Sequence, residues 1–253
     1  MLKKPLVLET LGVLIFLLVW HLISTYRFMP AYAIPSPARV VEALAANSHA
    51  IAAAIPQSLL HLALGFTLAF AVAVPLGMLM GSFRSVERGL FGVVEVLRPI
   101  PPIAWVPFAL LLFATYLEAS MFIIFIGAFF PLLTNVYFGF KNVPTSLIEV
   151  VRVMGGGGKE ILVKVSLPSA LPSILTGVKT SIGVAWMCVV AAEMFGAPGL
   201  GYLIMNYRYL HDIAAVVAVM VVIGFLGLAL EVAVKLIENR MLRWQKGLMG
   251  VSR

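Results

Sequence analysis

The sequence predicts an all-α polytopic membrane protein with six transmembrane helices. Of its 253 residues, 62% are hydrophobic and only 11% are charged, and so little charge cannot cover the surface of a soluble domain. Several uncharged stretches approach or exceed the roughly 18 residues that mark a membrane-spanning helix. A transmembrane β-barrel would instead show alternating segments of about 10 residues, and these stretches do not alternate.

Six stretches are expected to span the membrane. They cover residues 10–26, 62–83, 99–117, 121–140, 170–194 and 213–230. In the second of them, Pro75 lacks a backbone donor and is expected to kink the helix. Gly77 and Gly81 have the small-residue spacing that suits close contact with another helix.

Shorter elements are expected between the spans. Ser36 can cap an extramembrane helix over residues 34–46, and Pro37 suits its first position. Residues 84–98 carry charged side chains among apolar ones and predict an interfacial helix. Four prolines within residues 98–107 prevent a regular first turn in the third span.

The chain is expected to divide into three parts. An N-terminal span and the extracytoplasmic short helix occupy residues 1–55, the transmembrane core occupies 56–240, and a basic cytoplasmic tail occupies 241–253.

The 18 lysines and arginines predict the orientation of the chain. Six spans place both termini on one side of the membrane, and 15 basic residues, Arg98 among them, are then assigned to that side. Only Arg27, Arg39 and Arg208 are assigned to the other side. Because basic residues collect on the cytoplasmic face, both termini are expected in the cytoplasm, and the net charge of +7 indicates no nucleic-acid partner.

No catalytic residue and no metal site are expected. Cys188 is the single cysteine and lies in an apolar stretch, where a small packed residue is the simplest interpretation. The four histidines and the few acidic residues show no metal-ligand spacing. A membrane enzyme would need clustered histidines or acids, and the sequence has none.

Residues 144–168 form a polar segment between two spans. Ser146 and Glu149 match a helix capping box, and Gly155 can take the left-handed conformation that ends a helix. A second short helix over 159–166 is expected to end at Leu167-Pro168. The apolar side chains of the first helix share one face. They are Leu147, Val150, Val151 and Met154.

The glycines at 155–158 followed by Lys159 suggest a phosphate-binding loop, but the match fails. Glu160 stands where that loop needs Ser or Thr, and Val153 stands where it needs its first glycine. The segment is therefore not expected to bind ATP, and the role of the four-glycine run is left open.

Glu149, Gly155 and Leu167-Pro168 at their spacing resemble the cytoplasmic signature loop of ABC importer permeases, which reads Glu-Ala-Ala, then Gly, then Leu-Pro. The chain departs from it at Val150-Val151 and in its extra glycines. Other segments are similar to the nitrate/sulfonate/taurine branch of that family. They are residues 35–37, 98–107, 127–131, 171–177, 192–194 and 199–204.

The resemblance implies a type I ABC importer fold and a permease subunit, not an enzyme. Two copies would form the translocation pathway for a small solute, expected to be an anion of the nitrate, sulfonate or taurine type. An extracytoplasmic binding protein would deliver the solute. Separate ATPase subunits would bind ATP and Mg, with no cofactor in this chain. The complex would lie among the lipids of a bacterial or archaeal plasma membrane.

The resemblance also implies roles for particular residues. The helix that couples to the ATPase would contain Ser146, Leu147, Glu149, Val150, Val151, Arg152, Met154 and Gly155. The elbow after it would contain Gly156, Lys159, Leu167 and Pro168.

Three further residues are candidates for the pathway or a gate: Trp105, Trp186 and Glu193. Trp186 could equally be a packing residue, and Glu193 could instead hold the loop over residues 196–201. An acid near the end of a span is usually functional or paired. The alternative function is an ATP-independent secondary transporter or channel, which should show polar residues in mid-span, where these spans show few.

Overall fold

The computed structural model describes residues 3–26 and 34–243, and within those ranges the regular elements are all helices. In chain order the elements are α1 Lys3–Thr25, α2 Pro37–Ala46, α3 Ser48–Ser82, α4 Arg84–Leu97, η1 Pro102–Trp105, α5 Val106–Leu112, α6 Tyr116–Lys141, α7 Thr145–Val153, α8 Gly158–Ile161, η2 Leu162–Ser166, α9 Leu167–Glu193, α10 Leu200–Tyr209 and α11 Ile213–Met241. Arg27, Lys246, Arg253 and most of the basic tail lie outside the described residues.

Within the described part of the chain, four helical stretches are long and apolar enough to cross a membrane. They are α3, α6, α11 and the continuous stretch Gly158–Glu193. The pair Arg84–Leu97 and Pro102–Leu112 adds a fifth if it is counted as one bent span, and Thr10–Thr25 is apolar but shorter. The all-helical membrane fold is confirmed, and the count of six spans stays a prediction.

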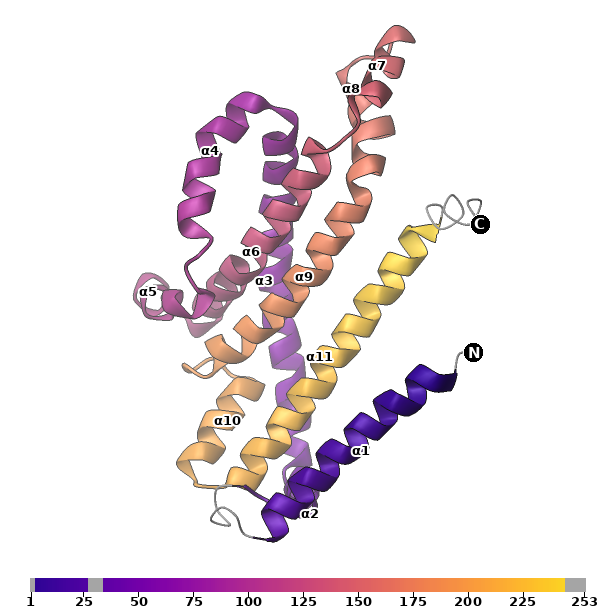
Figure 1. Cartoon of the computed structure of the whole chain (residues 1–253). Helices are drawn as coiled ribbons and strands as arrows, with labels where there is room; N and C mark the ends of the chain where they lie inside the picture. The colour runs from indigo at the N-terminus through magenta and orange to yellow at the C-terminus, as the bar shows by residue number, and fades with distance from the viewer. Residues whose placement is uncertain (1–2, 27–33, 244–253) are drawn as a thin grey trace.

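The helices α3, α6 and α9 pack side by side and form the centre of the bundle (Figure 1). One apolar core lies between them toward α10 and contains Ile123, Ile124 and Val189. A second lies toward the α7 end and contains Leu132 and Val136. Figure 1 shows α7 and α8 at one end of the bundle, and α2 with the turn between α10 and α11 at the opposite end.

The expected close contact at Gly77 and Gly81 is confirmed. A Cβ atom on Gly77 would lie 2.8 Å from Cβ of Val136, and one on Gly81 would lie 2.6 Å from Cβ of Phe140. Real Cβ atoms do not approach so closely, so glycine at these positions lets the backbones of α3 and α6 come together.

The second span is longer than its expected range of 62–83. α3 begins at Ser48, directly after α2, and continues through Pro56 and Pro75 to Ser82. Helix α2 itself is as expected, because the hydroxyl of Ser36 accepts a bond from the N–H of Arg39 at 3.4 Å. The polar residues between 48 and 61 hid the early start of α3, and two of them, Ser58 and His61, are buried inside the bundle.

The helix expected over 84–98 forms as α4, and its interfacial position stays a prediction, whereas the third span expected over 99–117 does not form as one continuous helix. α4 runs along the bundle (Figure 1) and packs Val86, Leu90 and Val94 onto the second core. The proline-rich segment then turns the chain by 88° into η1 and α5. Prolines lack the N–H groups that a continuous helix would need, so the chain bends where a straight span was expected.

The structure also shows how far from the α7 end Arg98 lies, a residue that the charge count had assigned to the side of the termini. Arg98 caps the C-terminal end of α4, and the 14 residues of that helix extend about 21 Å from its start at about 1.5 Å per residue. Arg98 therefore lies partway along the bundle rather than at its α7 end, and its side chain is 50% accessible.

The short helix expected over 159–166 does not end at Leu167-Pro168. α8 passes through the π-helical turn η2 into α9, and Gly158–Glu193 forms one stretch of 36 residues. The N–H of Leu167 bonds to the carbonyl of Leu162, five residues earlier. Pro168 has no N–H to give, and the wider π turn before it lets the helix continue.

Candidate functional site

The helix α7 stands at the tip of the bundle and is short and sharply ended (Figure 1). Gly155 has φ of +81°, the left-handed conformation expected of it. Its N–H donates to the carbonyl of Arg152 at 3.0 Å, and the N–H of Gly156 donates to the carbonyl of Val151 at 2.8 Å. These two bonds form the Schellman motif, which satisfies the last carbonyls of a helix.

The capping box expected at Ser146 and Glu149 is not formed. Pro144 is the N-cap residue, and no side chain bonds to the first turn of α7. Ser146 is already the second helical residue, so its hydroxyl cannot cap the helix that contains it. A carboxylate does cap the next helix, where Glu160 accepts the N–H of Gly157 at 3.1 Å.

The apolar side chains of α7 are exposed. Leu147, Val150 and Met154 are 47%, 56% and 82% accessible, and they follow the helical spacing of a single face. Val151, expected on the same face, is half-buried, because its side chain leans over Gly156. Exposed apolar patches of this kind mark interaction sites.

The polar and elbow residues around this face are also accessible. Glu149, Arg152, Lys159, Leu167 and Pro168 are exposed.

The four glycines that follow α7 do not have equal roles. Gly155 is required by its backbone conformation. Gly156 is required by contact, because a Cβ atom there would collide with the side chain of Val151. Gly158 would meet nothing within 4 Å, and Gly157 only the carboxylate of Glu160 at 3.2 Å. The first two glycines therefore shape the elbow, and the last two are sterically replaceable.

Glu193, at the C-terminal end of α9, is fully buried and bonded from three sides. The hydroxyl of Ser58 and the N–H of Gly201 both donate to its Oε2 at 2.9 Å. Nδ1 of His61 lies 2.9 Å from its Oε1. The N–H of Leu200 donates in turn to the Ser58 hydroxyl at 2.9 Å. The network joins α3, α9 and the start of α10, and a gating role for Glu193 stays a prediction.

The sequence had not indicated Ser58 or His61. They lie 135 and 132 positions before Glu193, and nothing in their spacing names a distant partner. A signal was nevertheless present. Both are polar residues one helical turn apart in an apolar helix, and an acid buried in another span needs such partners.

The two tryptophans lie in surroundings different from that of Glu193. The indole nitrogen of Trp105 is buried and has no hydrogen-bond partner among the described residues. The Trp105 ring packs edge-on against Phe108 and Phe122, with ring centroids 5.9 and 6.2 Å apart. The indole N–H of Trp186 donates to the carbonyl of Ile223 at 3.2 Å and ties α9 to α11.

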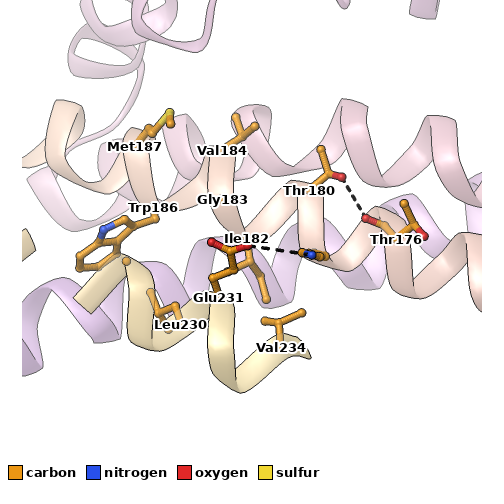
Figure 2. Close-up of a pocket in the computed structure, with 12 residues that line it drawn as sticks. Thr176, Thr180, Ile182, Gly183, Val184, Trp186, Met187, Leu230, Glu231 and Val234 are labelled. Atoms are coloured by element: carbon orange, nitrogen blue, oxygen red, sulfur yellow. Dashed lines mark hydrogen bonds and ion pairs between the residues drawn. The ribbon is translucent and has the colours of Figure 1, made fainter. Parts of the chain in front are cut away.

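Trp186 also lines a cavity of about 580 Å³ between α9 and α11 (Figure 2). The lining is mostly apolar, with Thr176 and Thr180 on one wall. The amine of Lys179 lies 3.9 Å from Oε1 of Glu231 across it, and both side chains are accessible. An exposed pair at this distance contributes little to stability.

The fold and the tip define a class of protein: a multi-pass helical membrane protein that carries a short helix with an exposed apolar face at one end. Residues 73–243 match the family described as binding-protein-dependent transport system inner membrane component. The chain belongs to this family, the permeases of ABC importers, which are transport subunits rather than enzymes.

Relatives span most of the chain. A protein of Methanocaldococcus jannaschii named as an ABC transporter permease is 50% identical over 184 residues, 72% of this chain and 69% of that protein. A permease named for aliphatic sulfonate transport in Bacillus subtilis is 31% identical over 92% of this chain and 85% of its own. One named for bicarbonate transport in Synechococcus elongatus is 35% identical over 74% of this chain and 68% of its own.

A solved structure shares the fold. The inward-facing methionine ABC transporter matches with a TM-score of 0.68 at 22% identity, over 77% of this chain and 97% of that chain.

Proposed function

We propose that this chain forms the translocation pathway of an ATP-driven importer for a small anion. The relatives named for sulfonate and bicarbonate transport support an anionic substrate. An extracytoplasmic binding protein delivers the anion, and two copies of the chain enclose the pathway between them. Two ATPase subunits bind ATP and Mg, and this chain needs no cofactor of its own.

The observation that carries the proposal is the exposed apolar face of α7. Leu147, Val150 and Met154 are accessible on a helix that stands beyond the membrane-spanning helices (Figure 1). Burying a side chain of this size stabilises an interface by about 1.5–3 kcal/mol. The face fits a hydrophobic cleft on the ATPase, and Glu149 at its side fits a basic residue there.

The orientation follows from this docking. The α7 end faces the cytoplasm, where ATP is, and so do both termini of the chain. Of the extracytoplasmic basic residues expected from the sequence, Arg39 on α2 and Arg208 on α10 belong to elements away from the α7 end.

The mechanism is alternating access. ATP draws the two ATPases together, and α7 of each copy moves with its ATPase, so that the helices open the pathway toward the binding protein. Hydrolysis resets the complex. ATP can drive this change only because it binds one conformation more tightly than the other.

The test is assembly with the ATPase. The chain is expressed together with its partner P-loop ATPase, and Val150→Asp and Met154→Asp place a charge on the α7 face. We expect both variants to lose co-purification of the ATPase. The matched control is Val41→Asp, which changes a valine of intermediate accessibility between Val150 and Met154, on α2 at the other end of the bundle. Anion uptake that persists without any ATPase would contradict the proposal.

A further inference from the structure

A second cavity, of about 370 Å³, lies at the bend between α4 and α5. Arg98 lines it together with Pro102 before α5, Thr134 and Asn135 of α6, and Val184 of α9. Arg98 is the one charged residue among the described residues that line it, and no carboxylate does. The cavity therefore presents a single positive charge.

The position of this charge calls for an explanation. The lining residues of α6 run from Ile126 to Asn135, 6 to 15 positions before the end of that helix at Lys141, or about 9–22 Å along it at about 1.5 Å per residue. Arginines near helix ends extend their side chains to the membrane surface, but Arg98 stands at the far end of α4 from α7, beside residues in the middle of α6. Charged residues held at such depth are costly and mark ion or substrate pathways.

Arg98 has only a loose partner. Its Nη1 lies 3.4 Å from Oε1 of Glu95, one turn earlier on α4, and both side chains are 50% accessible. Charge-assisted bonds are usually about 2.7–2.9 Å long, and exposed pairs one turn apart contribute little. A guanidinium carries five N–H donors, so most of them remain available to a ligand.

The polar groups of α6 leave a further donor. The hydroxyl of Thr134 donates to the carbonyl of Phe130, and Nδ2 of Asn135 donates to the carbonyl of Pro131, both at 2.8 Å. An amide nitrogen carries two protons. The second proton of Asn135 can therefore serve a ligand in the cavity beside Arg98.

We infer that the cavity at Arg98 is a substrate site within the pathway, where the guanidinium binds a small monovalent oxyanion. The inference rests on the proposed function and adds the residue that holds the anion in transit. The planar fork of arginine matches two oxygens of a nitrate, bicarbonate or sulfonate group. One charge without a lining carboxylate matches an ion of one negative charge. A pathway site must also release its ion, and the accessible guanidinium allows this.

The test uses the whole transporter, with its ATPase and binding protein, in lipid vesicles. ATP-driven uptake is measured for nitrate, bicarbonate and methanesulfonate, and ATP hydrolysis is measured in the same vesicles. We expect Arg98→Gln to lower uptake of the transported anion at least about tenfold while ATP hydrolysis continues. Arg98→Lys keeps the charge and should retain part of the uptake. Arg88→Gln, which removes a charge from the same helix away from the cavity, should transport normally.

Glu95→Gln separates a binding role from a structural pair. If Arg98 binds the anion, removing its carboxylate partner keeps or raises uptake. Equal losses in Glu95→Gln and Arg98→Gln, or normal uptake in Arg98→Gln, would overturn the inference while leaving the proposed function intact. If the wild-type complex takes up none of the three anions, the proposed anion import fails, and the inference fails with it.

Discussion

Replacing Glu193 with alanine should destabilise the protein substantially, because it would leave three buried donors without an acceptor. The carboxylate accepts from Ser58, Gly201 and His61, each at 2.9 Å, and none of this reaches water, since Glu193 is 0% and His61 2% accessible. An unsatisfied buried donor costs about 1–3 kcal/mol. Three donors at the low end of that range give a loss of about 3 kcal/mol.

Glutamine at the same position should be much milder. Its oxygen can keep the bonds from Ser58 and Gly201, and its amide would face Nδ1 of His61. A neutral imidazole can then accept at that nitrogen by carrying its proton on the other one. We therefore expect Glu193→Gln to cost about 1 kcal/mol, the usual value of one hydrogen bond.

The assay is thermal unfolding of the purified protein in detergent. In a chain of this size, 1 kcal/mol shifts Tm by about 2–4 °C, so Glu193→Ala should unfold about 6–12 °C below the wild type and Glu193→Gln about 2–4 °C below it. The reasoning is refuted if the alanine variant unfolds with the wild-type Tm. A glutamine variant as unstable as the alanine variant would show instead that His61 is charged, since a buried charge without its partner costs about 3–5 kcal/mol.

Two further predictions use matched pairs of variants. Ser58→Ala should lower the free energy of unfolding by about 2 kcal/mol, because the buried N–H of Leu200 loses its acceptor. Ser181→Ala should leave it unchanged, because that buried hydroxyl has no partner in the described structure. Chemical denaturation of the two variants compares these values. Gly65→Ala should cost about 1–3 kcal/mol by overpacking against α6, since its Cβ would lie 2.6 Å from Ile124. Gly89→Ala meets nothing within 4 Å and should stabilise α4 by about 0.5–1 kcal/mol, and a Tm for Gly65→Ala at or above that of Gly89→Ala would disprove the packing argument.

Local chemistry explains what the sequence could predict. Ser36 and Pro37 begin a helix because of their own side chains, and Gly155 ends one because of its own backbone freedom. Gly77 and Gly81 indicated a close contact because small residues at that spacing let two helix backbones approach each other. For Ser36, Pro37 and Gly155 the deciding interaction lies within a few residues of the pattern, whereas for Gly77 and Gly81 the spacing indicated a contact without naming its partner in α6.

The contacts that the sequence did not indicate lie between distant segments of the chain. Ser58 and His61 lie more than 130 positions from Glu193, so only the packing of α3 against α9 brings them together. Residues 84–98 have the charge pattern of a surface helix, but Val86 and Leu90 found a core to pack on. The capping box at Ser146 failed for a local reason, because the N-cap of α7 is Pro144, two residues earlier.

The contact between α3 and α6 has a mechanical consequence. Each of three glycines in α3 faces the residue 59 positions later in α6 (124 − 65, 136 − 77, 140 − 81): Gly65 faces Ile124, Gly77 faces Val136 and Gly81 faces Phe140. If one helix slid past the other, these side chains of α6 would meet residues larger than glycine on α3. Close-packed interiors resist such a displacement.

The two helices should therefore move as a stiff arm, and residues 142–144 join that arm directly to α7. A displacement of α7 would therefore be transmitted almost fully along α3 and α6 to the opposite end of the bundle. The conformational change of the transport cycle must then take place at another point of the chain. The 88° bend beside Arg98 is such a point, because the helix is already interrupted there.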